Sequence, residues 1–289
     1  MRRFLSFCRV FYLLLLLTAC QRITINDIGG YTPTSSPVTT IAPALNPYSP
    51  IIPSTIVVIN STESKYIPFT LTEIHTQITT PMQTEIPFSM CSPLFQETIS
   101  SLSEIITNPY GSPPVGREDL HHGVDFAYYR RGDRLSIEGE IIQSILPGTV
   151  AASIKDRLPY GNMVIIETEQ TMLPKTFVER FGLKTGESLY SLYAHMGQSP
   201  LVELGRKISC GQPLGTVGLT GYNIVNPHLH LEIRIGPSDA RFNEMAFYDT
   251  SASTEEMDNY KRWRTSGDFK HIDPMLLFAE YMSYLHPGF

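Results

Sequence analysis

Short apolar runs separated by glycines dominate the second half of the chain. Runs this short, with glycine turns between them, are typical of β-strands. The sequence predicts strands at 148–154, 163–168, 189–194, 214–218 and 229–235. We therefore expect a mainly β fold, an antiparallel β-sheet domain with a few short helices.

Two segments have the periodicity of helices instead. Between 94 and 106 the apolar residues fall roughly on one side of a helix, which Pro109 and Gly111 would end. Near the end of the chain, Asp273 can cap a helix that starts at Pro274 and runs through PMLLFAEYMSYL, because proline suits the first helical position. We expect the first helix to pack against the β domain and the second to close it.

The N-terminal residues 1–20 have the features of a secretion signal. Arginines come before an apolar run at 10–19, which ends at Cys20 and is about half as long as a bilayer span. Residues 17–20 (LTAC) resemble a bacterial lipoprotein box, which implies that Cys20 is lipidated and becomes the mature N-terminus. We expect a lipid-anchored protein exported from the cytoplasm, facing the cell wall or periplasm. Ordinary cleavage and an uncleaved anchor are the alternatives.

Residues 21–90 are rich in Thr, Ser, Pro and Ile and carry few charges. Frequent prolines interrupt both helices and strand ladders, so this stretch is predicted to be a disordered tether. The folded domain would then span 91–289.

The overall composition limits the classes of function. A chain of 289 residues with 42% hydrophobic residues can build a core, and a net charge of -6 gives no basic footprint for nucleic acid. The basic residues Lys261, Arg262 and Arg264 surround Trp263, and we interpret this cluster as a solvated loop.

The cysteines fit an exported protein. Cys8 lies in the signal and Cys20 at the anchor, which leaves Cys91 and Cys210 for the oxidising compartment. These two could form a disulfide or remain separate thiols, because sequence alone does not give the distance between their α-carbons.

Two histidine patterns lie about a hundred residues apart, HHGVD at 121–125 and HLH at 228–230. In extended segments alternate side chains share a face, so His121 with Asp125, and His228 with His230, could converge. Two imidazoles and one carboxylate are typical of hydrolytic zinc sites, which leave the fourth position open. A closed structural zinc site would need more cysteines than this chain has.

These patterns belong to an ordered series of segments. HHGVDFAYY is followed by PGTV, GNMVIIE, SLYAHM, GQPLGTVGLTG and NPHLHLEIRI. The series resembles the lysostaphin-type zinc metallopeptidases, which cut peptidoglycan cross-bridges and share an antiparallel β fold. The resemblance extends over about 120–274.

The resemblance implies the roles of individual residues. It makes His121, Asp125 and His230 the ligands of one zinc ion, and His195 and His228 the non-ligand histidines of the active site. Zinc polarises a carbonyl and activates water, while neutral imidazoles can take a proton or stabilise an oxyanion. A purely orienting role for both histidines is the alternative. His122 falls at a variable position and should point away.

Two segments are longer than the family pattern, 169–188 and 236–270. Loops around a rigid β site commonly set specificity, and we expect 169–188 to lie beside the groove lined by His195. The resulting hypothesis is a lipid-anchored zinc endopeptidase that hydrolyses peptide bonds of peptidoglycan stems or cross-bridges. A non-catalytic cell-wall binding module that activates another hydrolase, and a zinc peptidase acting on secreted peptides, are the alternatives.

Overall fold

The computed structural model describes residues 88–286. The signal, Cys20 and nearly all of the tether predicted from the sequence lie outside these residues. Within the described part, no helix has the length and apolar character needed to cross a membrane.

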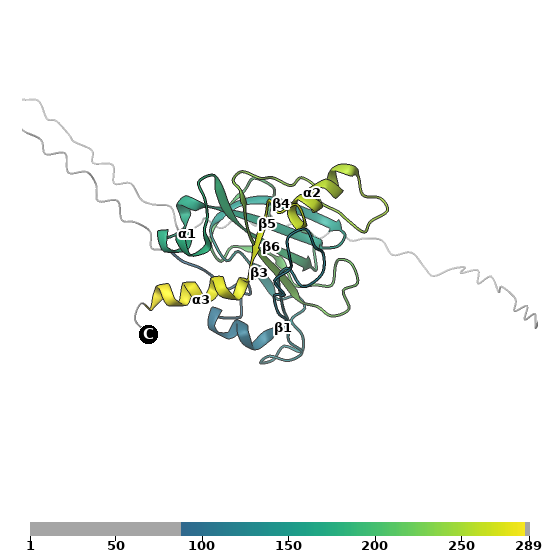
Figure 1. The fold of residues 1–289 in the computed structure, drawn as a ribbon. Coiled ribbons are helices and arrows are strands. Elements are labelled where there is room, and N and C mark those ends of the chain that lie inside the picture. Colours follow the sequence, from purple (N-terminus) through teal and green to yellow (C-terminus); the bar gives the residue numbers. More distant parts are fainter. Residues whose placement is uncertain (1–87, 287–289) are drawn as a thin grey trace, which may run out of the picture. The chain divides into compact units, whose positions relative to one another are not determined.

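The fold is mainly β and antiparallel, as the apolar runs predict. The large sheet has eight strands, in the order β1-β2-β9-β6-β5-β4-β7, with β10 also paired to β9 (Figure 1). A second sheet pairs β3 with β8. The strands are β1 Ile106–Asn108, β2 Val124–Phe126, β3 Ile141–Gln143, β4 Gly148–Arg157, β5 Gly161–Glu169, β6 Glu187–Met196, β7 Lys207–Ile208, β8 Pro213–Thr216, β9 Leu229–Pro237 and β10 Lys270–Ile272.

Strand β9 shows how the sheet separates two cores. Its odd-numbered residues, from Leu229 to Ile235, are buried in one apolar cluster. The even-numbered His230, Glu232 and Arg234 are equally buried but lie on the other face, because successive side chains of a strand alternate. A second apolar cluster, which contains Trp263, covers that other face. One side of β9 is thus apolar, and the opposite side carries a buried polar row.

The two predicted helices have different outcomes. Helix α3, Pro274–Leu285, begins as predicted, and the Asp273 side chain accepts a hydrogen bond from the Met275 amide at 2.9 Å. The segment 94–106 instead contains a 3-10 helix, Ile99–Ile105, that runs directly into β1. Apolar residues three apart fit the three residues per turn of a 3-10 helix, so the apolar face is buried in a tighter element.

The interpretation of the basic cluster at 261–264 as a solvated loop is wrong. These residues end helix α2, Thr254–Arg264, which starts with a capping box between Ser253 and Glu256. Trp263 is fully buried, and the Arg262 guanidinium lies 5.7 Å from the centre of the Phe242 ring. The helix is anchored to the sheet by its aromatic residue, which the charges on either side of it conceal in the sequence.

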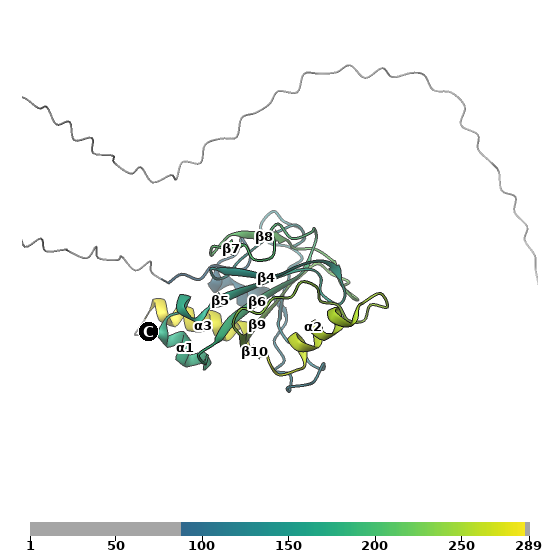
Figure 2. The ribbon, with the colours of Figure 1, turned by 90° about the horizontal axis from the view of Figure 1, so that it is seen from above.

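The expectation that 169–188 lies beside the groove of His195 is also wrong. This segment, with the 3-10 helix η2 Gln170–Met172 and helix α1 Lys175–Phe181, joins the end of β5 to the start of β6. His195 is near the other end of β6, several residues along the strand. Figure 2 shows α1 beside α3 at one end of the sheet, while α2 lies at the other. Closeness in sequence to the YAH motif did not mean closeness in space.

Cys91 and Cys210 form a disulfide. Their α-carbons are 5.7 Å apart, within the usual range for a bridge. The bond connects the start of the described chain to the turn between β7 and β8.

Candidate metal and catalytic site

Strand pairing brings Asp125 and His230 together. In the β2–β9 ladder the two residues lie directly opposite each other, so their side chains share a face. His121 comes three residues before β2. Its Nε2 lies 3.1 Å from Asp125 Oδ1 and 3.1 Å from His230 Nδ1, and His230 Nδ1 lies 2.8 Å from Asp125 Oδ1. The three residues predicted as ligands thus direct one atom each at a common point.

Gly123 makes the approach of β2 to β9 possible. A β-carbon at this position would lie 2.3 Å from the carbonyl oxygen of Leu231. Any larger residue would push the strands apart, and Asp125 would move away from His230.

Hydrogen bonds fix which nitrogen of each histidine faces this point. His121 Nδ1 donates to the Pro109 carbonyl at 3.0 Å, and His230 Nε2 donates to Glu232 Oε1 at 3.1 Å. His121 Nε2 and His230 Nδ1 are therefore the nitrogens that face the Asp125 carboxylate. Ligand atoms about 2.0–2.1 Å from a tetrahedral zinc lie roughly 3.3 Å apart, so this donor set fits the metal.

His195 and His228 lie beside these three residues. Their ring centres are 4.8 Å apart, and His228 Nε2 lies 3.8 Å from Asp125 Oδ1. His195 Nδ1 donates to the Thr220 carbonyl and His228 Nδ1 to the Asn226 carbonyl, both at 2.9 Å. Each ring is held through Nδ1, which leaves Nε2 to act in the site.

The backbone around His195 is adapted to this placement. His195 has φ 61°, which breaks the regular alternation at the end of β6. Gly221 has φ 115°, and a β-carbon there would lie 2.8 Å from His195 Nδ1. Only glycine combines this backbone conformation with such a close approach.

Burial and neighbouring charges set the protonation of the two buried histidines. Burial lowers the pKa of His195 to about 3, with further lowering by His230 and His228. For His230 burial also favours the neutral form, but hydrogen bonds with Asp125 and Glu232 outweigh it and raise the pKa to about 9. His195 is therefore a neutral imidazole at pH 7, as a proton acceptor requires.

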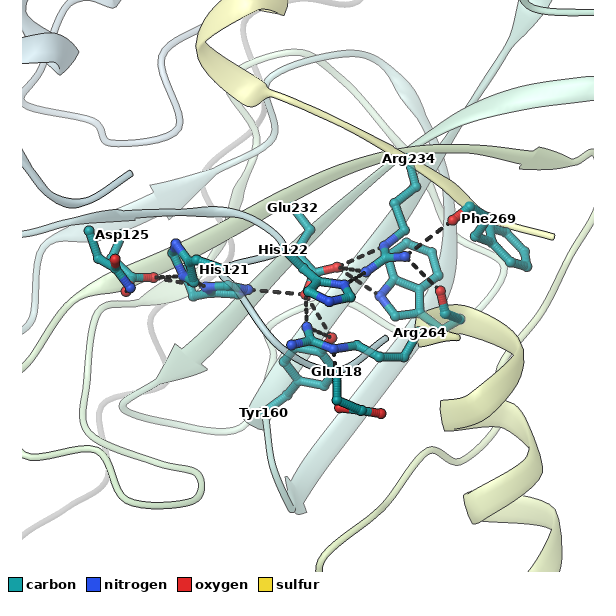
Figure 3. A network of polar contacts seen from close by, with 12 residues as sticks. Glu118, His121, His122, Asp125, Tyr160, Glu232, Arg234, Arg264 and Phe269 are labelled. Atoms are coloured by element: carbon teal, nitrogen blue, oxygen red, sulfur yellow. Dashed lines mark hydrogen bonds and ion pairs between the residues drawn. The ribbon is translucent and has the colours of Figure 1, made fainter. Parts of the chain in front are cut away.

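A polar network that was not predicted from the sequence supports His230 on the side away from Asp125 (Figure 3). Glu232 is fully buried, and its carboxylate accepts hydrogen bonds from Arg234 Nε at 2.8 Å, Trp263 Nε1 at 3.0 Å and Arg264 Nη1 at 3.0 Å. Tyr160 also donates to Glu232. The alternation in LHLEIRI could have indicated Glu232, because it puts the residue two positions after His230 on the same face.

His122 points away from the donor set, as expected. The Arg234 guanidinium donates to its Nδ1 at 2.9 Å, and the side chain is buried. Burial and the charge of Arg264 lower the pKa of His122 to about 3. Its role is structural, within the network behind the site.

The three converging residues line a pocket of about 330 Å³, and His195 and His228 line it as well. The long segment 236–270 contributes Tyr248, Tyr260 and Arg264 to its wall. This second long segment thus shapes the rim, in contrast to 169–188.

A family model for peptidase family M23 matches residues 119–243. Residues 119–243 form a peptidase family M23 domain. Both histidine patterns lie within it. The M23 domain includes all five predicted site residues, whereas helix α2 with Arg264 lies beyond the matched region.

Solved structures similar to the chain include M23 enzymes. The catalytic domain of lysostaphin from Staphylococcus simulans is 19% identical, with a TM-score of 0.36, covering 64% of this chain and 99% of that one. The catalytic domain of the M23 protein EnpA from Enterococcus faecalis is 25% identical, with a TM-score of 0.34, covering 48% and 87%. A zinc-containing peptidase from Vibrio cholerae is 23% identical, with a TM-score of 0.31, covering 44% and 32%.

Proposed function

We propose that the protein is a zinc-dependent endopeptidase that hydrolyses peptide bonds of peptidoglycan stems or cross-bridges. The observation that carries this proposal is the convergence of His121 Nε2, Asp125 Oδ1 and His230 Nδ1 within 3.1 Å of one another in an M23 domain. Lysostaphin, described as an antimicrobial peptidase, is among the similar proteins. The open pocket around the donor set is suited to an extended substrate.

The residues divide the chemical work between them. His121, Asp125 and His230 would hold zinc, which supplies Lewis-acid activation of a carbonyl and of water. The Nε2 atoms of His195 and His228 are placed to accept a proton and to donate it to the leaving amine, or to stabilise negative charge on the carbonyl oxygen. Because both rings are held by backbone carbonyls, neither needs to reorient during the reaction.

The complete donor set argues against a non-catalytic module that only activates another hydrolase. A binding module would have no use for two further imidazoles beside three converging ligands. A peptidase for secreted peptides would require both long segments to close the pocket, but only 236–270 borders it and 169–188 lies at the far end of the sheet.

A digest of purified sacculi tests the proposal. The full-length protein, purified in detergent and loaded with zinc, should release peptide-linked fragments that mass spectrometry identifies, and a chelator should stop the reaction. His230→Ala should lose the metal, as measured by elemental analysis. His195→Ala and His228→Ala should keep it and lose about a hundredfold or more in rate.

His286→Ala is the matched control, since His286 is exposed at the end of α3. It should retain both zinc and activity. Sacculi that remain intact with zinc-loaded protein, or full activity in the His195 and His228 variants, would contradict the proposal.

A further inference from the structure

A second pocket opens beside the metal-site pocket. We call it the side pocket; it has a volume of about 240 Å³. Asp125, Ile224 and His228 line both pockets. The side pocket is formed by the segment that follows β2 and by the loop that leads into β9. A group bound at the metal site is therefore directly at its entrance.

The wall of the side pocket is mainly apolar, and its other residues are mostly uncharged polar ones: Thr107, Ser136, Asn223 and Asn226. Apolar surface comes from Ala127, Tyr128, Tyr129, Ile224, Val225 and Pro227. Among the described residues that line it, only Asp125 and His228 can carry a charge, and both belong to the metal site. A charged substrate side chain would lose water there without gaining an oppositely charged partner outside the metal site, whereas an aliphatic one would gain from burial.

The side pocket is small and its sides are held in place. Pockets for drug-sized ligands begin at about 300 Å³, so this one admits a side chain rather than a saccharide. The Tyr128 hydroxyl donates to the buried Glu140, and His228 is held by the Asn226 carbonyl at 2.9 Å. Two of the walls are therefore fixed before substrate binds.

Peptide geometry connects the side pocket to the reaction. Consecutive α-carbons are about 3.8 Å apart, so a peptide whose carbonyl lies at the metal site puts a neighbouring side chain near Asp125 and His228. These residues form the entrance.

We propose that the side pocket is the subsite for an uncharged aliphatic side chain on a residue that flanks the scissile bond. This inference rests on the proposed peptidase function. It predicts a preference for bonds next to residues such as alanine, valine or leucine over bonds between two glycines or next to charged residues.

Peptides built around the bond identified in the sacculus digest provide the test. Each residue flanking this bond is varied in turn among Gly, Ala, Leu, Glu and Lys, and kcat/KM is measured with the zinc-loaded full-length protein. At one flanking position, kcat/KM for the Leu or Ala peptide should exceed that for the Gly peptide by about tenfold or more. It should exceed kcat/KM for the Glu and Lys peptides by at least as much.

Val225→Glu should change this order. Val225 is 81% exposed, so the substitution should not disturb folding, and the new carboxylate should raise kcat/KM for the Lys peptide above that for the Leu peptide. Leu219→Glu is the control, because Leu219 is an exposed residue that does not line the side pocket. It should leave the wild-type order intact.

The outcomes separate the two proposals. If zinc-loaded protein cleaves neither sacculi nor peptides, the peptidase function and the subsite both fail. If cleavage occurs but Gly, Leu and charged peptides react within twofold of one another, the subsite alone fails. The same conclusion follows if Val225→Glu behaves like Leu219→Glu.

Discussion

Glu232 connects the metal-site residue His230 to Arg234 and Arg264. It accepts from His230 Nε2 at 3.1 Å, while Arg234 and Arg264 donate to its two oxygens at 2.8 and 3.0 Å. Burial alone would raise the pKa of Glu232, but Arg234 and the hydrogen bond from His230 hold it well below the usual range. The ionised carboxylate holds a proton on His230 Nε2, so Nδ1 is the nitrogen that can bind a metal.

Replacing Glu232 should therefore weaken metal binding. In Glu232→Gln the uncharged amide holds the His230 ring less firmly, and we expect zinc affinity to fall about 10–100-fold. The two arginines also lose their buried partner, so the free energy of unfolding should fall by about 3–5 kcal/mol. A competition titration with a chromogenic chelator measures the first effect, and urea unfolding measures the second.

Glu167→Gln is the matched control. Glu167 is also buried, accepts from Arg241 at 2.5 Å and from the Asp239 amide at 2.7 Å, and makes no contact with the metal site. Hydrogen bonds from Arg241 and Asp239 lower its pKa although burial opposes this. The variant should lose stability with unchanged zinc affinity. Equal losses of zinc affinity in both variants would show that Glu232 acts only through the fold.

The sequence predicted the residues at the centre of the site and missed their supports. The spacing within HHGVD and HLH indicates a metal site, and the resemblance to a known family implies His121, Asp125 and His230 as its ligands. Arg264 contacts Glu232 only because a distant helix packs back onto β9. Nothing in the residues next to Arg264 indicates this contact, since it depends on tertiary packing.

The connection between β5 and β6 has a structural role. Phe177 of α1 is fully buried, and its ring lies 5.0 Å from that of Phe88 and 6.1 Å from that of Tyr284 at the end of α3. Contacts of this kind hold α1 and α3 to one end of the sheet. The apolar runs predicted the strands on both sides but not which end of the sheet carries the connection.

Phe177→Ala should accordingly lower stability and leave the active site unchanged. Removing a buried phenylalanine costs about 3–5 kcal/mol, which urea unfolding can measure. Zinc affinity and the products released from sacculi should remain those of the wild type. Lys175→Ala on the exposed surface of α1 is the control, and it should leave stability, zinc affinity and products unchanged. A changed product pattern at unchanged stability would restore the expectation that this segment contacts substrate.

The disulfide observed in the folded domain fits the export that the N-terminal sequence predicts. The bond between Cys91 and Cys210 closes a sequence separation of 119 residues, and such bonds persist outside the reducing cytoplasm. Peptidoglycan, the proposed substrate, also lies outside the cytoplasm. We therefore propose that the protein is exported, because the disulfide and the signal predicted from the sequence both favour this.

The resemblance of residues 17–20 to a lipoprotein box suggests how an exported form of the protein would be retained at a membrane. We propose that Cys20 carries lipid, because the apolar run before it is too short to span a bilayer. In bacteria grown with a fatty-acid analogue, the wild-type protein should be labelled and should fractionate with membranes, whereas Cys20→Ser should be unlabelled. Cys8→Ser, within the signal itself, is the control and should be labelled like the wild type. Equal labelling of Cys20→Ser, or a wild-type protein recovered entirely in the soluble fraction, would mean that another mode of attachment or release follows export.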